Sequence, residues 1–122
     1  MNNEFGKVSL ELAKKMKELG VKQKSEWYWI VETGNAYIEN ENNLFGVHND
    51  HLEDIYSAFT VAELGKMLPE KAYTWFNGKE WVSDYEIFTK QPNIGTGTFR
   101  YSERTNTEAD CRAKMLIWLK EK

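Results

Sequence analysis

The chain has 122 residues, a hydrophobic content of 41% and a formal net charge of −3 at pH 7. This length suits a single domain, 1–122, that can bury a core without disulfides or a structural metal. The negative charge argues against nucleic acid as the partner. No apolar run approaches the roughly 20 residues of a membrane span, residues 1–15 lack the apolar stretch of a secretory signal, and the single cysteine fits a reducing compartment. We therefore expect a soluble, cytoplasmic protein with no membrane contact.

The first helical pattern covers residues 9–21, "SLELAKKMKELGV". Leu12, Met16 and Leu19 recur at the spacing of one helix face. Ser9 can cap the start of this helix, and Gly20 suits the left-handed residue that ends it.

The second helical pattern, "FTVAELGKMLPE" at 59–70, has the strongest end signals in the chain. Thr60 and Glu63 match a capping box, and Phe59 and Leu64 are placed for a hydrophobic staple across it. Pro69 ends the helix.

The third helix is predicted within residues 105–122, capped either by Thr105 with Glu108 or by Thr107 with Asp110. Its apolar side chains occupy two patches around the cylinder, so we expect other elements to cover most of it. The patches consist of Ala109, Ala113, Leu116 and Ile117, and of Cys111, Met115 and Trp118.

Between the helices the hydrophobic period changes to two, which is typical of strands. Candidate strands are 26–32, 36–39, 44–47, the two arms of 72–83, 85–88 and 98–102. The element order α-β-β-(β)-α-β-β-(β)-α predicts a two-layer α+β domain with an antiparallel sheet and three helices.

The segment 72–83, "AYTWFNGKEWVS", predicts a hairpin. A two-residue turn at Asn77-Gly78 would place Trp75 opposite Glu80 and Phe76 opposite Lys79. Trp75 then shares a face with Tyr73 and Val82, while Phe76 shares the other face with Trp81.

Aromatic side chains occupy both faces of the predicted strands, whereas a sheet covered on one side should alternate apolar with polar residues. Either both faces are covered, or one face is an exposed aromatic surface that binds a partner. The candidate binding residues are Trp27, Trp29, Trp75, Phe76 and Trp81. We expect a non-enzymatic interaction domain that needs no cofactor, and whose partner is another protein or a second copy in a homodimer.

The alternative function is a metal-binding protein or a small metal-dependent enzyme using His48, Asp50 and His51 of "VHNDH". Two histidines three residues apart could share a helix face, but zinc needs three or four protein ligands and the zinc-protease spacing is four. A solvated polar loop is the competing interpretation.

Two other motifs favour structural interpretations. Cys111 has no neighbouring base in the sequence and is expected to be a packed apolar side chain. Gly95-x-Gly97 lacks the third glycine of a phosphate loop, which favours a loop between strands.

Three stretches together resemble a family of small uncharacterised bacterial proteins found in phage, prophage and other mobile elements. They are "LELAKKMKELGVKQKSEWYW", "FTVAELGKMLPE" and "TEADCRAKMLIWLKEK". The matching positions are helix ends, apolar faces and the start of a strand. The resemblance implies one compact domain in a bacterial or phage setting, and it carries no catalytic or binding residues with it.

Overall fold

The computed structural model describes residues 6–32, 34–42, 55–91 and 95–122, with backbone alone for 87–91 and 95–100. Its elements are α1 (Leu10–Glu18), β1 (Trp27–Glu32), β2 (Asn35–Asn40), β3 (Ile55–Ser57), α2 (Val61–Met67), β4 (Ala72–Phe76), β5 (Trp81–Gln91), β6 (Gly95–Thr105) and α3 (Glu108–Glu121). The α+β class and the predicted order of helices and strands are confirmed.

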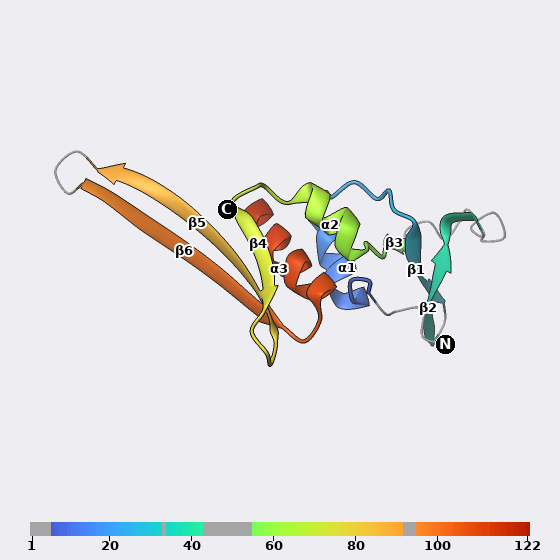
Figure 1. Ribbon diagram of the computed structural model, residues 1–122. Coiled ribbons are helices and arrows are strands. Elements are labelled where there is room, and N and C mark those ends of the chain that lie inside the picture. The colour runs from blue at the N-terminus through green and yellow to red at the C-terminus, as the bar shows by residue number, and fades with distance from the viewer. Residues whose placement is uncertain (1–5, 33, 43–54, 92–94) are drawn as a thin grey trace.

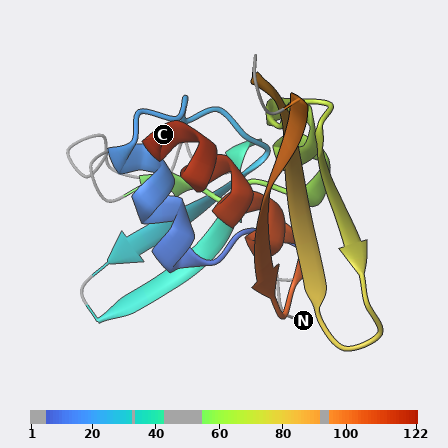
Figure 2. The same ribbon diagram turned by 90° about the vertical axis from the view of Figure 1, so that its left-hand side faces the viewer.

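The strands divide between two antiparallel sheets, whereas the sequence pattern predicted one antiparallel sheet in a two-layer domain. One sheet has the strand order β2-β1-β3 and the other has the order β4-β5-β6. The three helices lie between the two sheets (Figure 1). Figure 2 shows the same arrangement turned by 90°, with β4 as the outermost strand of its sheet. None of the helices that the structure describes is long and apolar enough to cross a bilayer.

Three strand predictions need correction. The third strand of the first sheet is Ile55–Ser57, which we did not predict, whereas the candidate at 44–47 lies outside the described residues. The candidates at 81–83 and 85–88 belong to one strand, β5. Gly95 and Gly97 are part of β6, where they pair with Gln91 and Thr89, so the predicted loop there is wrong.

The ends of α1 follow the sequence signals in part. Gly20 has a φ of +85°, and the Val21 amide donates to the Met16 carbonyl at 3.0 Å, which is the six-residue bond of a Schellman end. Ser9 occupies the N-cap, but its side chain makes no capping bond. Its amide instead donates to Asp110 Oδ1 at 2.7 Å, which joins the start of α1 to α3.

The capping box of α2 is confirmed in both directions. The Glu63 amide donates to Thr60 Oγ1 at 3.3 Å, and the Thr60 amide donates to Glu63 Oε1 at 2.9 Å. Phe59 and Leu64 on either side of the box are both buried in the core, as the predicted staple requires.

The last helix is capped by the second of the two predicted pairs, because Thr107 Oγ1 accepts from the Asp110 amide at 3.2 Å. Both apolar patches are covered, since six side chains spread around the cylinder are buried. They are Ala109, Cys111, Ala113, Met115, Leu116 and Ile117.

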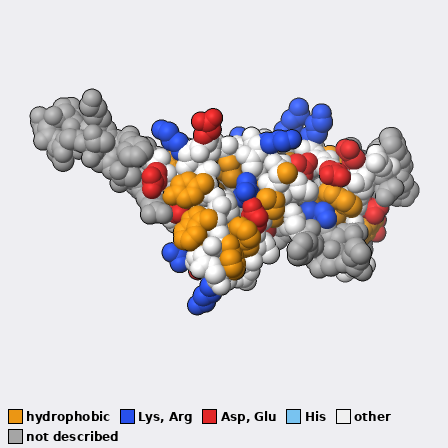
Figure 3. Space-filling view, viewed as in Figure 1, with side chains coloured by type: hydrophobic (Ala, Val, Ile, Leu, Met, Phe, Trp, Pro, Cys, Tyr) orange, Lys and Arg blue, Asp and Glu red, His pale blue; other side chains and the backbone are white. Residues whose placement is uncertain are grey.

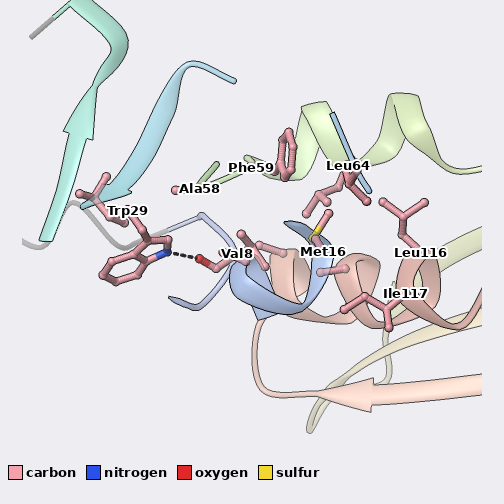
Figure 4. Close-up of a cluster of buried hydrophobic side chains, with 13 residues drawn as sticks. Val8, Met16, Trp29, Ala58, Phe59, Leu64, Leu116 and Ile117 are labelled. Atoms are coloured by element: carbon pink, nitrogen blue, oxygen red, sulfur yellow. Dashed lines mark hydrogen bonds between the residues drawn. The ribbon is translucent and has the colours of Figure 1, made fainter. Parts of the chain in front are cut away.

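The core is centred on the helix layer. One cluster of buried side chains joins all three helices to β1 and β2, and Figure 4 shows Met16, Leu64 and Leu116 pointing toward one another within it. On the other side of α3, Cys111 and Met115 are buried beside the second sheet. Helix α3 therefore supplies buried side chains in both directions.

The β4–β5 turn lies one residue further along the chain than predicted. Phe76 pairs with Trp81 and Trp75 with Val82, so the predicted pairs with Lys79 and Glu80 are wrong. The Asn77 side chain accepts from the amides of Lys79 and Glu80, and of these turn residues only Gly78 has a positive φ. Gly78 and Lys79 thus lie at the centre of the turn. The shift leaves the predicted assignment of side chains to faces unchanged.

Candidate functional site

The two tryptophans of the first sheet belong to the packed part of the molecule. Trp29 is 5% exposed, and its Nε1 donates to the Val8 carbonyl at 2.9 Å (Figure 4). Trp27 is half-buried against the same core cluster, and Lys7 Nζ lies 4.3 Å from its ring centroid. Trp29 is thus part of the core, and Trp27 is partly covered by the core and by Lys7.

In the second sheet the three candidates differ in exposure. Trp81 is half-buried, and its ring centroid lies 5.3 Å from that of Phe76. Trp75 and Phe76 are 42% and 52% exposed. The structure therefore brings together three of the five predicted residues at one hairpin and leaves Trp27 and Trp29 elsewhere.

A pocket of about 610 Å³ is lined by one candidate tryptophan from each sheet. Trp29 and Trp81 both line it, together with Val8, Val61 and the first residues of α3. Trp75 and Phe76 do not, so the pocket and the exposed aromatic residues are separate features.

Tyr73 completes the exposed aromatic group. It is 45% exposed and lies two residues before Trp75, hence on the same face of β4. We define the β4 aromatic surface as Tyr73 and Trp75 on this face, together with Phe76 at the end of the strand on the opposite face. Figure 3 shows hydrophobic side chains gathered over this strand. The alternation of side chains in the sequence places Tyr73 on the same face as Trp75. Alternation alone does not show whether that face is buried or exposed.

Trp75 is exposed and yet fixed in orientation. Its Nε1 donates to Asp84 Oδ2 at 2.8 Å, although β4 pairs Trp75 with Val82 and pairs Asp84 with Tyr73. The indole therefore leans diagonally across β5. Asp84 is only 1% exposed, and its other carboxylate oxygen accepts from the Ser102 hydroxyl.

Asp84 was not predicted as a functional residue. In the sequence it is visible only as an acid two residues after Val82, and so on the same face of the strand. Trp75 lies opposite Val82 on the facing strand of the hairpin. Sequence patterns give no reason to bury such an acid, and its burial follows from contacts with the two neighbouring strands. A buried carboxylate normally needs hydrogen-bond donors, and here Trp75 and Ser102 supply them.

The opposite face of the same sheet is occupied by α3. Trp118 stacks on Tyr101 with centroids 3.8 Å apart, and also contacts Tyr85 at 6.0 Å. The Cys111 thiol donates to the Glu103 carbonyl at 3.5 Å. Helices thus cover one face of this sheet, and the face with Tyr73 and Trp75 points away from them.

The metal alternative rests on residues that the structure does not describe, since His48, Asp50 and His51 all lie in 43–54. Within the described ranges no group of three or more His, Cys, Asp or Glu side chains is arranged to hold a metal ion. The metal site therefore stays a prediction without structural support.

Cys111 is placed as a packed side chain, with 0% exposure. Burial raises the pKa of its thiol, which reduces the thiolate that would act as a nucleophile. We expect a disulfide reagent to label native Cys111 about 100-fold or more slowly than the unfolded chain, because local opening must come first. The measurement is the labelling rate with and without denaturant; equal rates would contradict the burial.

Stability should fall at alkaline pH. Burial and a hydrogen bond to Glu103 raise the pKa of Tyr101 to about 12, from an ordinary value of 10.0. The folded state therefore holds this proton more tightly, so the contribution to stability is complete below pH 10 and is lost as pH rises toward 12. We would measure the free energy of unfolding across this range. Tyr101→Phe should lose less stability there than the native protein, and identical slopes would exclude this cause.

Comparison with protein-family models, curated proteins and solved structures found no significant match.

Proposed function

We propose that this protein is a non-enzymatic interaction domain, and that the β4 aromatic surface contacts a protein partner in the cytoplasm. The supporting observation is that most of the exposed large hydrophobic side chains lie on one strand. Four large hydrophobic side chains are exposed in the described part of the chain, and three of them, Tyr73, Trp75 and Phe76, lie on the five-residue strand β4. Exposed aromatic side chains gathered on one short strand in this way mark interaction sites, although Phe76 lies on the opposite face of the strand from Tyr73 and Trp75.

The fixed indole adds a physical reason for binding. A side chain that is already held in one orientation loses little rotational freedom when a partner covers it. Trp75 is held by its bond to the buried Asp84, and the indole N–H is satisfied inside the protein. A partner therefore meets the ring surface, which favours an apolar or aromatic contact.

The neighbouring polar groups suit the rim of a protein interface. Arg104 pairs with Glu80 at 3.3 Å and keeps 62% of its side chain exposed. Tryptophan, tyrosine and arginine are the residues most enriched among those that dominate binding energy. We also propose that the resemblance to phage and mobile-element proteins reflects this kind of partner-binding role.

The test is site-specific photocrosslinking in the producing cell. A benzophenone amino acid replaces Tyr73 in one variant and Tyr37 in the other. Tyr37 is the matched control, because it is a 38% exposed tyrosine on β2 of the other sheet. We expect discrete adducts from position 73 and none from position 37. Absence of adducts at 73, or equal adducts at both, would overturn the proposal.

A further inference from the structure

The free edge of β4 offers its main-chain groups to a second strand. β4 is a terminal strand of its sheet and pairs only with β5. The Asn77 amide donates to the Glu80 carbonyl at 3.1 Å, which makes these two residues a hydrogen-bonded pair. Because such pairs alternate along antiparallel strands, Tyr73 and Trp75 also direct their main-chain groups toward β5. Ala72, Thr74 and Phe76 direct theirs toward the free edge.

The other terminal strands of the described chain are protected. β2 carries Glu39, and β6 carries Glu103 and Arg104. β3 has no charged residue, but Lys17 Nζ donates to the Ile55 carbonyl at 3.1 Å and Gln23 Oε1 accepts from the Ser57 amide at 2.8 Å.

β4 has neither kind of protection. Its sequence, "AYTWF", contains no charged residue and no proline. Edge strands of monomeric proteins usually carry such residues because an open edge otherwise pairs with another chain. Among the residues that the structure describes, one bond uses these outward groups, from the Ala72 amide to the Pro69 carbonyl at 3.0 Å.

We propose that the partner is a second copy of this chain, paired antiparallel through β4 about a two-fold axis at Thr74. This inference rests on the proposed function and names its partner. With Thr74 opposite itself, Ala72 faces Phe76 of the other copy, so every outward residue of β4 meets an outward residue. The amides of Thr74 and Phe76 then donate to the carbonyls of Thr74 and Ala72 of the other copy. The two-fold axis repeats each bond.

The same register matches the side chains. Tyr73 lies opposite Trp75 of the second copy, in the non-hydrogen-bonded position where side chains come closest. The axis creates this aromatic pair twice on the face that points away from the helices. On the other face Phe76 meets Ala72, whose methyl group leaves room for the ring. A shift by one residue would place outward groups against inward ones, so it cannot form the ladder.

The experiment measures the mass of the purified full-length protein by analytical ultracentrifugation, from about 1 µM to about 1 mM, the range over which dimers of modest affinity dissociate. We expect the mass to double as the concentration rises. Thr74→Pro removes an amide that points away from β5, so it should keep the circular dichroism spectrum and abolish the doubling. A native protein that stays monomeric throughout overturns the proposal.

Disulfide trapping tests the register and does not depend on the proline variant. Cysteine at position 74 lies opposite itself on the axis, whereas cysteine at 73 is offset from its copy by two residues, beyond the roughly 7 Å limit for a bridge. We expect mild oxidation to link Thr74→Cys into covalent dimers and to leave Tyr73→Cys unlinked. Equal linkage of both, or linkage of Tyr73→Cys alone, overturns this register. If position 73 crosslinks only to a different protein in the cell, the homodimer fails while the interaction domain stands.

Discussion

Replacing Phe59 with alanine should lower the free energy of unfolding by about 3–5 kcal/mol, the usual cost of removing a buried phenylalanine ring. Phe59 is 2% exposed and packs among Val8, Met16 and Leu64 at the centre of the helix layer (Figure 4). A loss of this size is a large part of the 5–15 kcal/mol that ordinarily separates folded from unfolded states. The measurement is denaturant-induced unfolding.

Phe76→Ala is the matched control, since it removes the same ring from a position that is 52% exposed. We expect it to cost about 1 kcal/mol or less, mainly through the lost contact with Trp81. Curves at two protein concentrations separate any contribution from association. Equal losses for the two variants would show that the core is not centred where the structure places it.

Trp75→Phe should cost about 1.5–3 kcal/mol even though Trp75 is 42% exposed. The substitution keeps an aromatic ring but removes the Nε1 donor, and so deletes a hydrogen bond to the buried Asp84 carboxylate. A hydrogen bond to a buried charged group contributes more than the average surface contact. The effect should appear as a lower midpoint of unfolding with an unchanged slope.

The control for Trp75 is Tyr73→Phe, on the same strand and the same face. It removes a hydroxyl from a 45% exposed side chain and should change stability by no more than about 0.5 kcal/mol. Asp84→Asn provides a second comparison, because the amide oxygen can still accept from the indole. If Trp75→Phe is as mild as Tyr73→Phe, the bond to Asp84 does not hold the ring.

Local features of the fold were readable in the sequence because their causes lie within a few residues. Thr60 and Glu63 satisfy each other's amides across one turn, and Gly20 ends α1 through its own φ. The α+β class followed from the same local periodicities. The split into two sheets depends on which strands pair across long stretches of chain, and no local pattern fixes that choice.

The candidate site was only partly predictable for the same reason. Alternation placed Tyr73 and Trp75 on one face, but it could not show that Trp29 is buried beneath the Val8 segment, 21 residues earlier in the chain. The turn was misplaced because the Asn77 side chain accepts from the Lys79 amide, which a two-residue turn at 77–78 would have given to the Phe76 carbonyl. Asp84 was missed because its burial depends on a neighbouring strand.

The position of α3 between the sheets has a consequence for how the protein unfolds. Ile117 belongs to the cluster that includes β1 and β2, while Cys111 of the same helix bonds to β6. The first sheet packs on α1, α1 packs on α3, and α3 packs on the second sheet, so neither sheet can separate without exposing apolar side chains of the helix layer. The two sheets should therefore melt together in a single cooperative transition, with coincident curves from far-ultraviolet circular dichroism and tryptophan fluorescence.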